Sequence, residues 1–560
     1  MVRALLSAVG KEIRGMHEAA YLLATFAFLS QLLALVRDRL LASSFGAGHT
    51  LDLYYAAFRI PDFLFATVAS LLSLYALLPV LSRLEREHPG LAISFMRQAL
   101  LFFFTAMAVV CGVLFIFAPA FVALAAPGLF ATDGPQLVFL TRILLLQPIL
   151  IGASNILSNL TQLRHRFMLY SVSPLLYNLG IIFGIVVLYP YLGLKGLAWG
   201  VVLGALMHML VQVPYFAVER TPRTLPWRES FRYLREVLTL SLPRTLSLSA
   251  NQISLFVLTA LASLLSAGSI SVFMFAWNLQ AVPLTIIGVS YSVAAFPTLS
   301  RLFAGGATRE FIAHVETALR HMVFWAVPAT VLIIVLRAQL VRVILGAGAF
   351  DWSATRLVAA ALALLIVSLL AQSATLLISR AYYAAGNTRK PFYFALVNVF
   401  VSVGAAVTLA SLFHESQFFR FFLEGILRVS DLAGTTVLTL ALALALGAIV
   451  QCAVALWAFS RDFELLGGGG LWRLSFQSFA ASVIGGVCAY GVLGVTGLYL
   501  NINTTLGVFI QGALGGVVGL AVTATVLWLL KAPELFEVWD AFARRFRDTP
   551  PVALEPSDIS

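Results

Sequence analysis

Long apolar stretches recur along nearly the whole chain, and they constrain its fold more than any other feature. The sequence of 560 residues is 61% hydrophobic and only 11% charged. Many windows exceed the roughly 18–20 apolar residues that cross a bilayer as a helix. The strand alternation of a membrane-embedded barrel is absent, so helices must satisfy the backbone hydrogen bonds. We therefore predict an all-α polytopic membrane protein with about fourteen transmembrane helices.

Proline, glycine and charged residues divide this apolar sequence into candidate spans. They lie near 19–44, 51–82, 98–126, 136–163, 167–190, 194–218, 236–264, 268–300, 318–346, 353–386, 391–413, 432–460, 474–499 and 503–531. Most of the 36 basic residues fall in one alternating set of connections or in the two ends of the chain. The positive-inside rule places both termini in the cytoplasm, as an even number of spans requires. The net charge of +11 therefore reports topology and does not indicate nucleic-acid binding.

A short repeat suggests how the spans are organised. Leu203-Gly204-Ala205 in the sixth span matches Leu446-Gly447-Ala448 in the twelfth. The match predicts two six-helix lobes related by internal duplication, with the substrate site between them. We assign 1–18 to a cytoplasmic amphipathic start, 19–218 to the N-lobe, 219–235 to a cytoplasmic linker and 236–460 to the C-lobe, which includes an interfacial helix at 415–430. The remainder comprises a Gly-rich linker at 461–473, two added spans at 474–531, and a cytoplasmic amphipathic helix with a disordered tail at 532–560.

Six charged side chains are concentrated between Arg37 and Asp62, in an otherwise apolar segment. A charge inside the bilayer costs a few kcal/mol or more and usually faces a partner or a water-filled cavity. On a helix, Asp52, Tyr55, Arg59 and Asp62 share one face. Two interpretations stand: Arg59 and Asp62 neutralise each other near an interface, or the face lines a central cavity. Pro61 favours the cavity, because it frees a backbone carbonyl that lipid cannot satisfy.

The adjacent residues Arg37 and Asp38 point about 100° apart on a helix, so we expect that they do not easily share a partner. Arg37 either snorkels to an interface or faces the cavity. The cavity is favoured because basic residues are scarce on the outer side. We expect Arg39 to be an interface anchor.

The seventh span carries a second polar face. It combines Arg244, Ser247, Asn251 and Ser254. This face either lies opposite the first span across the cavity or bonds neighbouring helices. The three cysteines fall in apolar stretches without metal-ligand spacing, and no catalytic motif stands out. We therefore predict neither an enzyme nor a metal site. Arginines in an apolar bundle suit an amphiphilic anion, since guanidinium binds phosphate bidentately, and a lipid-linked phosphate is the expected ligand.

The charged segment resembles the N-terminal signature of the MurJ/MviN family, the lipid II flippases of the multidrug/oligosaccharidyl-lipid/polysaccharide exporter superfamily. The resemblance rests on Arg37-Asp38, Phe45-Gly46-Ala47-Gly48, Asp52 and Ala57-Phe58-Arg59-Ile60-Pro61. Further matches follow in the family's order: Gln252-Ile253-Ser254, Gly268-Ser269-Ile270-Ser271, Leu279, Pro283, Phe296-Pro297-Thr298-Leu299-Ser300, Gly348-Ala349-Phe350, Ala381-Tyr382-Tyr383, Thr388 and Pro391.

The resemblance implies a lipid II flippase of the bacterial cytoplasmic (inner) membrane that works by alternating access and needs no cofactor. Lipid II, or a related undecaprenyl-pyrophosphate glycolipid, would pass its headgroup through the cavity while its tail follows spans thirteen and fourteen. Membrane lipids are further partners, and the family link admits a coupling ion and cell-wall synthesis proteins. Our candidate substrate-binding residues are Arg37, Asp38, Asp52, Arg59, Asp62, Arg244, Ser271 and Asn278.

The chain also departs from the family pattern. The family usually has arginine where Gln31 and Asn278 stand and near Phe65, and a Glu-Gly pair where Ser70-Leu71 stands. One hypothesis is that Arg244 partly replaces a lost charge. The departures leave two alternatives open: export of another polyprenyl-pyrophosphate-linked oligosaccharide, or a non-transporting cell-wall scaffold.

Overall fold

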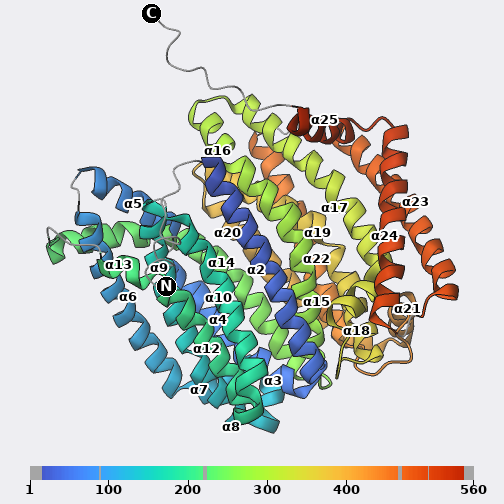
Figure 1. The fold of residues 1–560 in the computed structure, drawn as a ribbon, viewed down its shortest axis with the longest axis horizontal. Coiled ribbons are helices and arrows are strands. Elements are labelled where there is room, and N and C mark those ends of the chain that lie inside the picture. Colours follow the sequence, from blue (N-terminus) through green and yellow to red (C-terminus); the bar gives the residue numbers. More distant parts are fainter. Residues whose placement is uncertain are drawn as a thin grey trace, which may run out of the picture. The chain divides into compact units, whose positions relative to one another are not determined.

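The computed structural model describes residues 16–72, 74–87, 90–164, 166–218, 224–463, 470–501 and 504–547, and within these ranges the regular elements are all helices (Figure 1). Ten of the described helices are long and apolar enough to cross a membrane. The number rises to eleven if the bent pair Trp352–Ile366 and Leu369–Ala384 is one span. The all-α polytopic architecture is confirmed, while the number of fourteen spans stays a prediction. The expected start at 1–18 lies largely outside the described residues, as do residues 464–469 of the linker at 461–473 and the tail from 548 onward.

The helices group into two compact units. The first comprises the described residues within Met1–Val282, Val341–Ser368 and Gly386–Ala455. Its helices are α2 (Met16–Phe45), α3 (His49–Ala57), α4 (Arg59–Thr67), the 3₁₀ helix η1 (Ala69–Leu72), α5 (Leu74–Glu87), α6 (Leu91–Ile116), α7 (Ala118–Ala125), α8 (Pro127–Leu144), α9 (Leu146–Leu163), α10 (Phe167–Phe183), the π-helix η2 (Gly184–Leu188), α11 (Tyr189–Leu192), α12 (Leu194–Leu210), α13 (Val213–Val218), α14 (Trp227–Ser263), α15 (Ser269–Pro283), α18 (Trp352–Ile366), α20 (Arg389–Glu415) and α21 (Gln417–Leu427).

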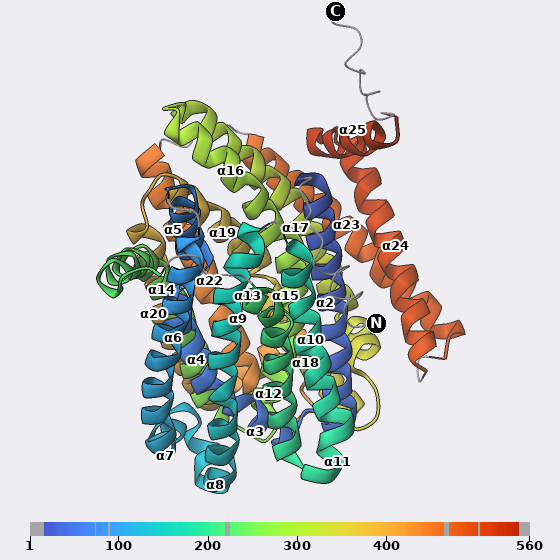
Figure 2. The same cartoon turned by 60° about the vertical axis from the view of Figure 1, so that its left-hand side comes forward.

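The second unit comprises the described residues within Pro283–Leu340, Leu369–Ala385 and Leu456–Ser560. It contains the π-helix η3 (Leu284–Val289), α16 (Ser290–Ala304), α19 (Leu369–Ala384), α23 (Gly470–Tyr499), α24 (Thr505–Leu529) and α25 (Pro533–Arg547), which Figure 2 shows from another side. Two long helices, α17 (Thr308–Leu345) and α22 (Val437–Phe463), contribute residues to both units. The boundaries of the two expected six-helix lobes stay a prediction.

The two repeat glycines lie at helix crossings of the same kind. A Cβ on Gly204 of α12 would meet the backbone of Tyr177 in α10, and a Cβ on Gly447 of α22 would meet Asn398 and Ser402 in α20. In each case the helix crosses the long helix that precedes it among the expected spans. Small residues let neighbouring helices in membranes approach closely, and the internal duplication itself stays a prediction.

We expect Gly204→Ala to lower the melting temperature of the purified protein by several degrees. The added methyl has no room against the backbone of Tyr177, and overpacking costs about 1–3 kcal/mol. Thermal unfolding in detergent measures the effect. The matched control is Gly112→Ala in α6, where a Cβ meets nothing within 4 Å. Equal melting temperatures for the two variants would contradict the crossing.

The expected second span, 51–82, is not one continuous helix. It is divided among α3, α4, η1 and α5, with the first break at Phe58. Pro61 explains this break, because it has no N–H to donate to the carbonyl four residues earlier and its ring crowds that carbonyl. The residues expected on one helical face are thereby divided between α3 and α4.

Both expected surface helices exist. The interfacial helix predicted at 415–430 is α21, whose exposed residues include Phe418 and Phe421. Its buried Glu424 accepts hydrogen bonds from Arg420 Nε at 3.0 Å and Thr435 Oγ1 at 2.6 Å. The predicted C-terminal helix is α25, held to α17 by ion pairs of Arg320 with Glu534 and His321 with Glu537.

Candidate functional site

The centre of the first unit holds a polar cluster built from α2, α10 and α15. Arg37 Nε and Nη2 donate to Asp38 Oδ1 at 2.9 and 2.8 Å, and Nη1 donates to Asn178 Oδ1 at 3.1 Å. Asn278 Nδ2 donates to the second carboxylate oxygen, Asp38 Oδ2, at 3.2 Å. We call Arg37, Asp38, Asn178 and Asn278 the arginine cluster. It joins residues up to 240 positions apart in the sequence.

The arrangement leaves Arg37 able to bind an anion. Arg37 and Asp38 form an ion pair with each other, and each also has its own amide partner, Asn178 for Arg37 and Asn278 for Asp38. The long arginine side chain folds back to its neighbour, although the Cβ atoms of adjacent helical residues point in different directions. The Arg37 side chain is 20% exposed whereas that of Asp38 is only 6% exposed. A guanidinium has five N–H donors, and only three hydrogen bonds are made here, so Arg37 retains donors for an anion.

Asp52 binds the start of α15. Its carboxylate accepts hydrogen bonds from Gly268 N at 2.6 Å, Ser271 N at 2.7 Å and Ser271 Oγ at 2.5 Å. The first amides of a helix have no partner within the helix, and the helix dipole favours a negative charge there. Asp52 therefore supplies the cap of a distant helix. The structure brings together two of our candidate residues, Asp52 and Ser271, as partners of each other.

Three turns meet beside this cap. Gly46–Gly48 links α2 to α3, residues 264–268 link α14 to α15, and residues 346–351 link α17 to α18. Ala349 N donates to Ser43 O at 2.8 Å. Gly268 has a φ of +90° and lies against Ala47 O, so both its backbone conformation and its contact require glycine. We call these three turns with Asp52 the turn cluster.

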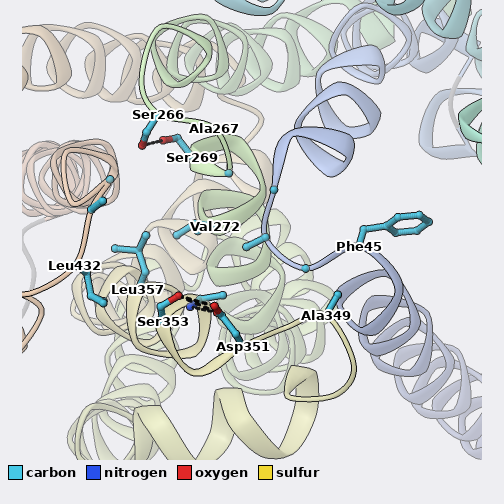
Figure 3. A pocket seen from close by; sticks show the side chains of 17 residues that line it. Phe45, Ser266, Ala267, Ser269, Val272, Ala349, Asp351, Ser353, Leu357 and Leu432 are labelled. Carbon is cyan, nitrogen blue, oxygen red and sulfur yellow. Dashed lines mark hydrogen bonds between the residues drawn. The ribbon is translucent and has the colours of Figure 1, made fainter.

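The turn cluster borders a small pocket of about 350 Å³ (Figure 3). Its polar groups include Ser269, which contacts Ser266 Oγ at 3.3 Å, and Asp351, which accepts hydrogen bonds from Ser353 Oγ and Ala354 N. Asp351 is the N-cap of α18. These polar groups already form hydrogen bonds within the pocket. The pocket therefore has fewer unused hydrogen-bonding groups for a ligand than the Arg37 guanidinium has.

Arg39 binds the end of a neighbouring helix, and its expected role as an interface anchor stays a prediction. Its Nη1 donates to Val343 O and to Ile344 O, the latter at 3.3 Å, in the last turn of α17. The carbonyls at a helix C-terminus lack partners within the helix and carry partial negative charge. A cation is stabilised at that position, which explains why the half-buried Arg39 side chain is bound there.

Arg59 and Asp62 form a weaker pair. The distance from Arg59 Nη2 to Asp62 Oδ2 is 3.7 Å, and Arg59 Nε donates to Tyr55 O at 3.4 Å. Arg59 is 5% exposed and Asp62 is 32% exposed. The structure thus shows Arg59 and Asp62 paired with each other, which was one of our two interpretations. Of the two side chains, the Asp62 carboxylate is the more exposed.

The polar face expected on the seventh span is partly resolved. The backbone of Arg244 lies in α14, but its side chain lies outside the described residues. Ser247 and Ser254 are buried, whereas Asn251 is exposed. Thr245 Oγ1 contacts Ser70 Oγ at 3.2 Å, which joins α14 to η1. Of the side chains described on this face, the two serines are therefore packed inside the protein and the asparagine is accessible.

Sequence reasoning missed Asn178, which receives Arg37 across 141 positions. Its signal was a lone amide in an apolar span one turn after Pro174, whose carbonyl it bonds at 3.2 Å. Within the described ranges, no group of three or more His, Cys, Asp or Glu side chains is assembled to hold a metal ion.

Comparisons with known proteins agree on one family. The family model described as lipid II flippase MurJ matches residues 41–510. The lipid II flippase MurJ of Burkholderia cenocepacia is 27% identical over 382 residues, covering 66% of this chain and 74% of the relative. The probable lipid II flippase MurJ of Thermotoga maritima is 26% identical over 387 residues, covering 68% and 77%.

Solved structures show the same fold. A lipid II flippase MurJ in an inward closed conformation aligns with a TM-score of 0.69 and 20% identity, covering 91% of this chain and 99% of that one. An inward-facing MATE multidrug transporter of the MOP superfamily aligns with a TM-score of 0.62 and 17% identity, covering 78% and 96%.

Proposed function

The chain belongs to the lipid II flippase MurJ family, and from this premise we propose that it moves lipid II across the bacterial inner membrane. The substrate carries a peptidoglycan-precursor headgroup on a polyprenyl pyrophosphate. The observation in this chain that supports the proposal is the arginine cluster. It places a guanidinium with unused donors among buried polar groups of an otherwise apolar unit.

Arg37 binds the pyrophosphate through its exposed side. Arginine matches phosphate oxygens bidentately, and charge-assisted hydrogen bonds are roughly twice as strong as neutral ones. Asp38 and Asn178 orient the guanidinium, and Asn278 holds Asp38 from α15. Asp62 and Arg59 act as a secondary polar surface, where the open carboxylate suits sugar or peptide hydroxyl and amide donors. Arg244 adds a cation in this proposal.

Asp52 and Ser271 close one end of the path without binding the substrate. Positive-inside reasoning assigns this end to the outer face, with both chain termini in the cytoplasm. At the proposed inner end, α5 and α14 are joined by Arg83 Nη2 and Glu236 Oε2 at 2.6 Å, with both side chains more than a third exposed. Exposed ion pairs contribute about 0–1 kcal/mol, whereas each unsatisfied buried donor costs about 1–3 kcal/mol. The inner end therefore opens more easily than the turn cluster.

The polyprenyl tail stays outside the polar path. Many apolar side chains of α23 and α24 are exposed, among them Val487, Leu498, Phe509 and Val517. A hydrocarbon tail can cover such residues in place of ordinary bilayer lipid, because both helices are candidate membrane spans and the tail is as apolar as lipid. We assign these two helices to the tail in this proposal.

Replacement of a depleted lipid II flippase tests the function. We expect cells that express this chain to survive the depletion and to expose lipid II on the outer face of the inner membrane, measured by labelling of the headgroup in spheroplasts. Membrane insertion is verified by fractionation. Failure to rescue with normal insertion, or outward appearance of a different polyprenyl-linked glycan instead of lipid II, would overturn the assignment.

A further inference from the structure

An open apolar groove of about 500 Å³ lies on the first unit, formed by α6, α8, the start of α9 and α12. It shares no lining residue with the arginine cluster or with the pocket of Figure 3. Phe115, Phe139 and Trp199 line it, and all three rings are exposed. A volume of this size lies within the range of small-molecule sites, about 300–1,000 Å³. The stretches that carry Phe115 and Phe139 are candidate membrane spans, so this groove meets hydrocarbon.

Arg142 lines the groove and Lys195 lies against one of its lining rings, so each of the two cations rests on an aromatic ring. Arg142 Nε donates to Phe115 O at 3.0 Å, and its guanidinium carbon lies 4.7 Å from the centre of the Phe115 ring. The Lys195 ammonium lies 4.8 Å from the centre of the Phe139 ring. In the described part of the chain neither cation forms an ion pair with a carboxylate.

The Arg142 guanidinium is held in place through one of its nitrogens, which leaves the other two nitrogens to bind an anion. The bond from Nε holds the guanidinium against Phe115, and both Nη groups stay uncommitted. An unpaired guanidinium beside hydrocarbon is costly unless an anion joins it. Trp199 lies one turn after Lys195 on α12, and tryptophan is typical of the membrane interface, where lipid headgroups meet acyl chains.

We propose that this groove binds one anionic glycerophospholipid from the surrounding leaflet. Its phosphodiester contacts Arg142, with Lys195 supplying further positive charge, and its acyl chain covers Phe115, Phe139 and Trp199. Basic pockets between membrane helices are a recognised means of holding acidic headgroups. A zwitterionic lipid fits less well, because its own cation would meet two others. With the orientation proposed above, this lipid belongs to the outer leaflet, and it joins α6, α8 and α12 as one body.

Native mass spectrometry of the purified full chain tests the site directly. The protein in detergent is titrated with phosphatidylglycerol or with phosphatidylcholine of identical acyl chains. We expect one phosphatidylglycerol to bind with about tenfold preference, because it lacks the choline cation that Arg142 and Lys195 would repel. The double variant Arg142→Gln/Lys195→Gln should lose that preference, while Arg309→Gln, which removes an exposed charge elsewhere, should retain it.

A second variant addresses the apolar part. Gly112 lines the groove, and a Cβ there meets nothing within 4 Å. Gly112→Leu should therefore fold normally, fill the groove and lower retention of both lipids about tenfold. Unchanged lipid preference in the double variant, or unchanged retention in Gly112→Leu, would overturn the site. Displacement of phosphatidylglycerol by a tenfold lower concentration of undecaprenyl phosphate would also overturn it, by assigning the groove to a polyprenyl lipid. The readout is equilibrium binding, so it is independent of whether lipid II is transported.

Discussion

Replacing Arg37 by alanine is expected to reduce lipid II transport at least a hundredfold. Two charge-assisted hydrogen bonds to the pyrophosphate are lost, each contributing about 1.5–3 kcal/mol. The same change leaves the Asp38 carboxylate without its cation, although Asp38 is only 4% exposed. Breaking a buried ion pair from one side costs about 3–5 kcal/mol. The single variant should therefore transport poorly and also unfold at a lower temperature.

The double variant Arg37→Gln/Asp38→Asn separates these two effects. It removes both charges while keeping side chains of similar length, so no buried charge remains unpaired. We expect its melting temperature to return most of the way to that of the unmodified protein, and its transport to stay lost. Thermal unfolding and lipid II translocation into reconstituted vesicles measure the two quantities. Transport at the original rate in the double variant would show that Arg37 serves only to neutralise Asp38.

The arginine cluster also shows which parts of the site the sequence could predict. A charge in an apolar span must have a partner, so Arg37 and Asp38 were identified from residue type and position, whereas Asn278 became a candidate only through the family resemblance. The partners were not predictable in the same way. Asn178 reaches Arg37 across 141 positions, and only the packing of α10 on α2 determines that contact. Local helix geometry did not reveal the pairing of Arg37 with its neighbour either, because it fixes Cβ directions but not the path of a long side chain.

The helical fold was easier to predict from the sequence than the binding partners of the charged side chains. Apolar length predicted the helices, and Pro61 predicted a disturbance that became the break at Phe58. Arg39 and Asp52 were harder, since both are bound to the ends of distant helices. A helix end carries a partial charge that no side chain reveals. Sequence reasoning that counts only charged residues therefore overstates how many are free to bind a substrate.

Replacing Asp52 by alanine is expected to loosen the turn cluster. The buried amides of Gly268 and Ser271 lose their acceptor, at about 1–3 kcal/mol for each unsatisfied donor. Openings that expose these amides should become about a hundredfold more frequent, because every 1.4 kcal/mol is a factor of ten. Hydrogen exchange followed by mass spectrometry on the peptide covering residues 264–272 measures this change. Asp351→Ala is the matched control: it removes the N-cap of α18, costs about 0.5–2 kcal/mol, and should speed exchange only in the first turn of that helix.

The same variant distinguishes a structural from a substrate-binding Asp52. If the carboxylate closes one end of the path, its loss leaves the turn cluster open, so the two ends of the path no longer open in alternation and transport falls. Faster hydrogen exchange at residues 264–272 should accompany this loss of transport. Asp52→Asn should behave much like alanine, since its amide group would direct N–H donors at the Gly268 amide in place of the Oδ2 acceptor. Lost transport with unchanged exchange would instead mean that Asp52 contacts the substrate. That outcome would also require the substrate to compete for a carboxylate that already accepts three hydrogen bonds, and this competition is why we expect the coupled result.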